Sequence, residues 1–131
     1  MTRARALVVA LFWIGAEINS TAFGHHSYAA TYLFEQTIRV EGEVMMFMYR
    51  NPHSTLQVLA PGPDGKSYRW ACEWAGTRAL DRNGVSNVTL KPGDRVIITG
   101  APGRNAENHR LLVKTIERPA DGWKWSGDST Q

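Results

Sequence analysis

The sequence predicts a single small all-β domain with one short helix. Its 131 residues are 43% hydrophobic and 21% charged, a composition typical of one globular domain. Five stretches alternate apolar with polar residues between turn signals, and a short helical stretch falls between the third and the fourth. An OB-like, five-stranded antiparallel Greek-key barrel has this order and this length. A small β-sandwich is the alternative architecture.

Residues 1–24 are predicted to be a signal peptide. Two arginines precede the apolar run Ala6–Ala16. That run is shorter than the about 20 apolar residues that cross a bilayer, so an uncleaved anchor is the less favoured alternative. Small residues allow cleavage after Gly24, which makes His25 the new N-terminus, or after Ala22. We therefore expect a periplasmic or secreted protein with no transmembrane segment in the mature chain.

The barrel is predicted over residues 37–118, after an N-terminal arm of residues 25–36. Its first strand, Thr37–Tyr49, is long and alternates in polarity. The apolar side chains assigned to one face are Ile38, Val40, Val44, Met46 and Met48. Gly42 in the middle of this strand favours a bend or a bulge, so a curved strand is expected.

The next two strands are predicted to form a hairpin. The stretch Ser54–Ala60 directs Leu56 inward and Thr55 and Gln57 outward. The turn-forming run PGPDG follows, and the returning strand is Lys66–Trp74.

The remaining barrel elements are a helix and two strands. Thr77 is expected to cap a short helix, Arg78–Asn83, which ends at Gly84. The strands Arg95–Gly100 and Leu111–Glu117 complete the predicted barrel.

Two further segments are expected to be irregular. The loop Ala101–His109 precedes the last barrel strand, and its His109 is expected to be solvated. The C-terminal tail, residues 119–131, is mostly polar and contains glycine. Trp123 and Trp125 in this tail are expected to pack back on the barrel.

Composition excludes several classes of function. The single cysteine, Cys72, rules out an intramolecular disulfide and a site made of cysteines alone, and its place between Trp70 and Trp74 predicts burial. A net charge of +3 is too small for a nucleic-acid-binding face, so no nucleic-acid partner is expected. Motifs for hydrolytic, kinase and dithiol redox chemistry are missing from the sequence, which favours a non-catalytic protein.

Three histidines suggest a copper site, or a site for a similar transition metal. Cleavage after Gly24 would give His25 a free α-amine, which chelates a metal together with its ring nitrogen Nδ1, and His26 and His53 offer further imidazoles. The methionines Met45, Met46 and Met48 lie just upstream of His53. Their thioethers would favour reduced copper. The alternative is that the histidines belong to a polar arm and a turn, and that the methionines fill the core.

A second hypothesis is a ligand-binding surface on the barrel. Its candidate residues are Thr55, Gln57, Arg69 and Glu73. Glu73 is expected either to pair with Arg69 or to bind a ligand, since the two side chains lie on one strand face. OB barrels bind small ligands, oligosaccharides or protein partners on such a surface, and a partner in the cell envelope would fit this hypothesis. A third hypothesis is an oxidative enzyme with copper at a terminal histidine.

Four motifs in order resemble a family of small exported bacterial proteins of unknown function. They are His25-His26-Ser27-Tyr28-Ala29-Ala30, Asn51-Pro52-His53, Trp70-Ala71-Cys72-Glu73 and Leu90-Lys91-Pro92-Gly93-Asp94. The resemblance covers nearly all of the mature chain. It implies a location in the bacterial envelope and a small β-barrel, and it supplies no activity.

Overall fold

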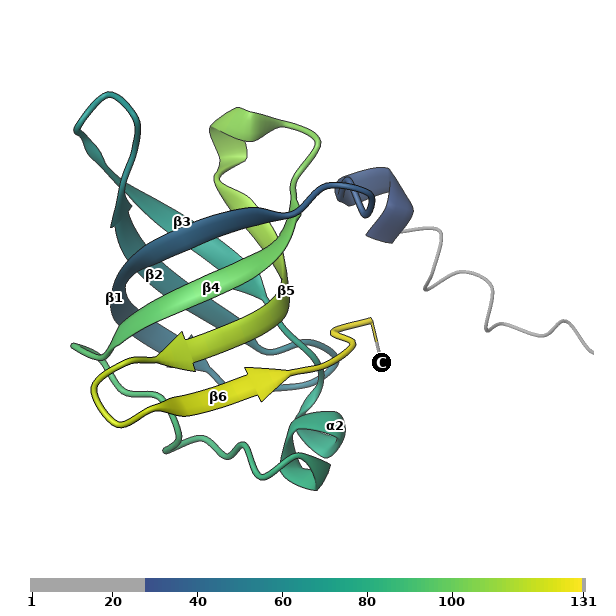
Figure 1. The fold of residues 1–131 in the computed structure, drawn as a ribbon. Coiled ribbons are helices and arrows are strands. Elements are labelled where there is room, and N and C mark those ends of the chain that lie inside the picture. The colour runs from purple at the N-terminus through teal and green to yellow at the C-terminus, as the bar shows by residue number, and fades with distance from the viewer. Residues whose placement is uncertain (1–27, 131) are drawn as a thin grey trace, which may run out of the picture.

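Six strands and short helical segments form the part of the chain that the computed structural model describes, residues 28–130 (Figure 1). Residues 28–31 are helical and precede the first strand. The predicted signal peptide, His25 and His26 lie outside this range. The elements are β1 (Ile38–Met48), β2 (Thr55–Pro61), β3 (Ser67–Glu73), α2 (Thr77–Arg82), β4 (Arg95–Pro102), η1 (Ala106–Asn108), β5 (Arg110–Arg118) and β6 (Trp123–Ser126). None of the described helices is long and apolar enough to cross a membrane.

Five of the strands close into the predicted OB-like barrel. The sheet order is β3-β2-β1-β4-β5-β6, and its neighbours are antiparallel. A parallel pairing between β3 and β5 joins the two ends and closes the barrel. The expected fold class, including the helix between the third and fourth strands, is therefore confirmed.

Strand β1 belongs to both halves of the barrel, as its predicted curvature requires. Its first half pairs with β4 and its second half with β2 (Figure 1). At Gly42 a Cβ atom would lie 2.2 Å from the backbone oxygen of Leu59. Only glycine lets the two backbones approach this closely, so the bend depends on the missing side chain.

The bulge in β1 lies beyond Gly42, between Val44 and Met46. The extra residue reverses which side chains face the core downstream. Phe47 consequently packs against the core, while Met46 is 48% exposed. The prediction that Met46 and Met48 share the inner face with Val44 was wrong for this reason.

Apolar side chains from the inner faces of the strands fill the barrel. The most completely buried strand residues include Val44, Leu56, Val58, Cys72, Val96, Ile98, Leu111 and Ile116. Trp74, which follows β3, and Leu80 of α2 are buried with them. Burial of Cys72 is confirmed, and it raises the pKa of the thiol to about 12.

Helix α2 begins one residue earlier than predicted. Its N-cap is Gly76, which provides no side chain, so the expected capping by Thr77 was wrong. The side-chain oxygen of Asn51, in the β1–β2 loop, instead accepts hydrogen bonds from the Thr77 backbone N–H at 3.0 Å and hydroxyl at 3.1 Å. The helix ends at Arg82, one residue before the predicted Asn83. The predicted role of Gly84 as a left-handed terminator is confirmed by its φ of 73°.

The C-terminal tail is not irregular as expected, because β6 adds a sixth strand beside β5. A turn at Gly122 (φ 73°) reverses the chain, and Arg118 pairs with Asp121 at 2.8 Å across it. Trp125 is only 7% exposed and meets Trp74 edge to face at 5.0 Å. The expected packing of this tryptophan on the barrel is confirmed.

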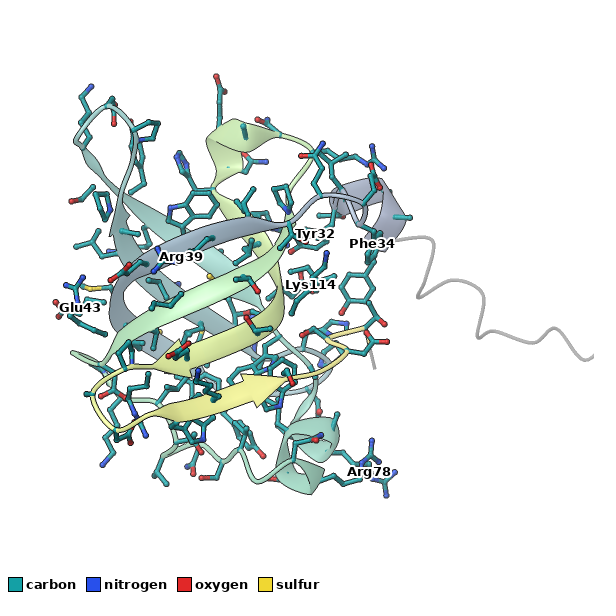
Figure 2. The ribbon with its side chains drawn as sticks, viewed as in Figure 1. Tyr32, Phe34, Arg39, Glu43, Arg78 and Lys114 are labelled. Carbon is teal, nitrogen blue, oxygen red and sulfur yellow. The ribbon has the colours of Figure 1, made fainter. Side chains whose placement is uncertain are left out.

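Residues 28–36 lie against the outer face of the barrel. Tyr28 and Tyr32 are buried there against Ala101 of β4 and Leu112 of β5, in a cluster separate from the barrel core. The side chain of Lys114 fastens this segment (Figure 2). Its ammonium group donates to Phe34 O at 3.2 Å, Gln36 O at 3.1 Å and Thr37 Oγ1 at 2.8 Å.

Candidate functional site

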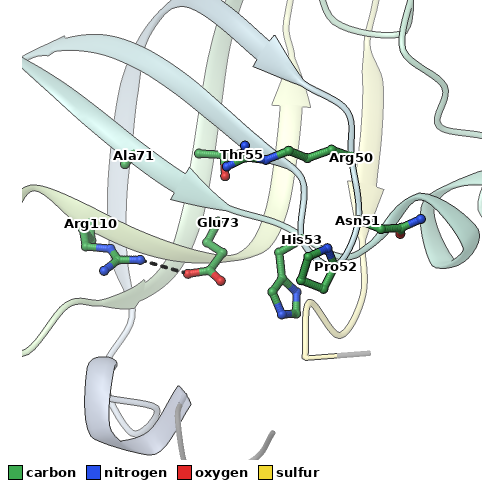
Figure 3. Close-up of a pocket in the computed structure, with 8 residues that line it drawn as sticks. All are labelled: Arg50, Asn51, Pro52, His53, Thr55, Ala71, Glu73 and Arg110. Carbon is green, nitrogen blue, oxygen red and sulfur yellow. Dashed lines mark hydrogen bonds and ion pairs between the residues drawn. The ribbon is translucent and has the colours of Figure 1, made fainter.

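A pocket of about 330 Å³ opens on the outer surface of the barrel, where the β1–β2 loop meets the end of β3 and the start of β5 (Figure 3). Six of its eight lining residues have polar side chains, and three of these side chains carry a full charge. The lining residues are Arg50, Asn51, Pro52, His53, Thr55, Ala71, Glu73 and Arg110.

The loop that carries Arg50 and His53 is fastened at both sides. The buried hydroxyl of Ser54 accepts from the Arg50 N–H at 3.2 Å. The backbone of Ser54 bonds Ala75 and Trp74 at 3.1 and 2.8 Å. The bonds from Asn51 to α2 fix the middle of the loop, so the scaffold holds the side chains of this loop at the pocket.

His53 contacts the start of the described chain. The hydroxyl of Tyr28 lies 2.6 Å from Nδ1 and 2.9 Å from Nε2 of His53, and the two rings meet edge to face at 5.1 Å. Burial, with the nearby charge of Glu73 adding to it, raises the pKa of Tyr28 well above its ordinary value. The phenol therefore stays protonated at neutral pH and can donate its proton to an imidazole nitrogen.

Glu73 is held by two donors. Tyr32 donates its hydroxyl to Oε2 at 2.5 Å, and Arg110 donates to the same oxygen at 3.2 Å. The Arg110 guanidinium also lies over the Tyr32 ring, 5.6 Å from its centroid. Burial, followed by the hydrogen bond to Glu73, raises the pKa of Tyr32 far above its ordinary value.

The expected ion pair between Arg69 and Glu73 was wrong. The Arg69 guanidinium lies 3.5 Å from the side-chain oxygen of Gln57, and Glu73 is paired with Arg110 instead. The parallel pairing of β3 with β5 places Arg110 opposite Ala71, two residues from Glu73. The closure of the barrel therefore brings Arg110 of β5 next to Glu73 of β3. The sequence of β3 alone does not reveal this cation.

The four predicted ligand-binding residues divide into two pairs. Thr55 and Glu73 are opposite each other in the β2–β3 register, and both line the pocket. Gln57 and Arg69 are partners of each other and do not line it. The sequence interpretation missed Arg50 and Arg110. Arg50 could have been found from its place beside Asn51-Pro52-His53, whereas Arg110 reaches the pocket only through the β3–β5 pairing.

Of the predicted metal ligands, only His53 lies within the described residues. Between residues 28 and 130, no group of three or more histidine, cysteine, aspartate or glutamate side chains could hold a metal ion. The pocket contains two side chains of the kinds that bind metals, the imidazole of His53 and the carboxylate of Glu73. Met46 and Met48 pair with Gln57 and Thr55 across β1 and β2, beside the pocket. The exposure of Met46 contradicts the alternative in which the methionines fill the core.

His109 is not a simple solvated loop residue as expected. Its ring stacks on Tyr68 with centroids 4.3 Å apart and meets the edge of Trp70 at 5.2 Å. His109 also adopts a left-handed backbone with a φ of 44° at the end of η1. The ring links the loop before β5 to β3 and does not line the pocket.

Comparison with known proteins finds similar solved structures and a matching family. The mitochondrial single-stranded DNA-binding protein Rim1 of S. cerevisiae aligns with 70% of this chain and 82% of its own, at 12% sequence identity and a TM-score of 0.42. No curated protein matches the sequence. A family of unknown function, DUF6152, matches residues 15–112.

Proposed function

The chain belongs to the DUF6152 family of unknown function, and we propose that it is an exported, non-catalytic module that binds copper or a similar transition metal. The proposed ligands are His25, His26 and His53. The observation that carries the proposal is the contact between His53 and Tyr28, because Tyr28 lies only two residues after His26 and three after His25 in the chain.

Chain length limits how far those histidines can lie from His53. One residue spans at most about 3.6 Å, so the three steps from Tyr28 back to His25 reach about 11 Å. The Tyr28 side chain is anchored by burial and by its contact with His53. Both N-terminal histidines are therefore within reach of the pocket, which supports a shared site.

The chemistry of these groups suits copper. A terminal His25 would supply its amine and ring nitrogen, and His53 would supply a third nitrogen, which gives the T-shaped arrangement that copper accepts. A metal-bound imidazole donates its other N–H to an oxygen acceptor, and the Tyr28 hydroxyl is near enough to accept it. The proposed periplasmic location rests on the predicted signal peptide.

Calorimetry of copper binding on a protein that begins at His25 tests this function. We expect His53→Ala, and separately the retention of Gly24 before His25, to weaken binding by at least about a hundredfold, because each removes a strong donor. Affinity should also fall at acidic pH, because protons compete with the metal for the ligand nitrogens.

His109→Ala is the matched control, since it removes an imidazole outside the pocket and should leave copper affinity unchanged. An affinity no tighter than that of a short His-His peptide, or one that is indifferent to His53→Ala, would contradict the proposal.

The second candidate function is binding of a small ligand without metal. It is supported by the pocket itself, in which Thr55 and Glu73 join Arg50 and Arg110. This candidate uses His53 for hydrogen bonding only, so copper titration separates the two functions.

A further inference from the structure

The pocket beside His53 carries an uncompensated positive charge. The carboxylate of Glu73 is balanced by Arg110 and receives a further hydrogen bond from Tyr32. Within residues 28–130, the guanidinium of Arg50 has neither a hydrogen-bond nor an ion-pair partner. Two arginines and one glutamate therefore leave one positive charge facing the cavity when His53 is neutral.

The two arginines approach the cavity from different elements. Figure 3 shows Arg50 and Arg110 extending from opposite sides of the view, with Thr55 and Glu73 between them. Arg110 is oriented before any ligand arrives, by its bond to Glu73 and by the Tyr32 ring. Because its guanidinium has five N–H donors and Glu73 takes one of them, others remain to bind a ligand oxygen.

The size of the cavity limits the ligand. A volume of about 330 Å³ lies at the lower end of the range for ligand pockets. Ala71 contributes only a methyl group to the lining, which keeps the cavity open. A molecule of a few carbon atoms fits this volume.

We propose that this pocket binds a small organic carboxylate, whose carboxylate group is held between Arg50 and Arg110. Planar guanidinium groups match the planar, singly charged carboxylate. A doubly charged phosphate is disfavoured, because Glu73 lines the same cavity and repels the second charge. The oxygen Oε1 of Glu73 takes part in neither of the bonds described above, and with the Thr55 hydroxyl it offers partners for a ligand hydroxyl group.

This inference deepens the second candidate function and does not depend on copper. Its test is an NMR titration of the isotope-labelled protein with lactate at low salt, after metals have been removed with EDTA and the EDTA itself has been dialysed away. Lactamide, which has the same size and no charge, and inorganic phosphate are titrated in parallel. We expect saturable shifts of the Thr55 and Glu73 amide signals with lactate, none with lactamide, and weaker shifts with phosphate.

The decisive variant is Arg50→Gln, since that guanidinium makes no contact that the fold requires. It should weaken lactate binding at least about tenfold and should not weaken copper binding, because it removes a cation from the pocket and no proposed copper ligand. Arg69→Gln is the matched control, because Arg69 lies on the same outer surface but does not line the pocket.

Four outcomes would overturn the proposal. They are equal shifts with lactamide, tighter binding of phosphate than of lactate, no saturable shift with lactate, and equal effects of the two substitutions on lactate binding. Loss of copper binding in His53→Ala, with lactate binding retained in Arg69→Gln, would support both sites independently.

Discussion

Glu73 illustrates how a single carboxylate can be accommodated at the surface of a small barrel. Its side chain is only 18% exposed, so its charge needs partners to offset the loss of hydration. Arg110 and Tyr32 provide them, and both come from segments distant in sequence. The motif Trp70-Ala71-Cys72-Glu73 therefore contributes an inward thiol to the core and an outward carboxylate to the pocket.

Cys72 yields a prediction at the same scale. The thiol is fully buried and its pKa is raised to about 12, so both access and the thiolate fraction are low near pH 8. The native protein should resist alkylation by iodoacetamide at that pH and react fully in denaturant, as measured by mass spectrometry. Rapid labelling of the native protein would show that the inner and outer faces of β3 are reversed.

Among the elements, β1 has the strictest requirement. This strand pairs with β2 in one half of the barrel and with β4 in the other, so it must bend between them. The bend brings a neighbouring backbone very close to the strand. Gly42 meets β2 in this way, and in β4 a Cβ atom at Gly100 would lie 2.1 Å from the backbone oxygen of Leu112. The register also shifts near each glycine, with Met45 as the extra residue in the β1–β2 pairing and Lys114 of β5 as the extra residue in the β4–β5 pairing. Close backbone approach and bulges together give the sheet the curvature that closure needs.

Substitution of Gly42 tests this explanation. Gly42→Ala would place a methyl group 2.2 Å from Leu59 O, which β2 cannot escape without moving. We expect the free energy of unfolding to fall by about 2 kcal/mol or more, measured by urea denaturation. Glu43→Ala on the same strand is the control, because its exposed side chain should matter by no more than about 0.5 kcal/mol. Equal effects of the two substitutions would mean that the bend does not depend on glycine.

The sequence predicted these elements well where local alternation decides the structure. All five barrel strands and α2 were located, because apolar alternation and turn residues are local signals. The bulge before Met46 and the strand β6 were missed, since both depend on which partner strand is adjacent. Only some of the residues that line the pocket could be predicted from the sequence, for the same reason. His53, Thr55 and Glu73 follow from motif and face, whereas Arg110 arrives through the parallel closure of the barrel.

On the scale of the whole molecule, the proposed sites lie where the N-terminal segment meets the barrel. The side chains of Tyr28 and Tyr32 form the contact, and each bonds a residue of the pocket. The barrel thus supplies its strands and the β1–β2 loop to the pocket, and the segment before β1 packs on the outer face of β4 and β5 beside it. Both proposed functions depend on this junction more than on the interior of the barrel.

Processing at the N-terminus is the prediction that concerns the entire chain. Cleavage after Gly24 is expected from the apolar run and the small residues that follow it, and it would give a mature protein of residues 25–131. Intact-mass measurement of the protein recovered from the periplasm of an expressing bacterium checks this. A terminus at Phe23, or an unprocessed chain at Met1, would remove the proposed amine ligand and leave only imidazoles.

The attachment of residues 28–37 to the outer face of the barrel has a practical consequence for the placement of a tag. Because Tyr28 packs on the barrel and contacts His53, anything fused ahead of Tyr28 starts near the mouth of the pocket. An affinity tag there would crowd the region to be assayed, and its own histidines would compete for added metal. The tip of the β2–β3 hairpin is a better place for a reporter, since nothing lies within 4 Å of the Cβ position at Gly65.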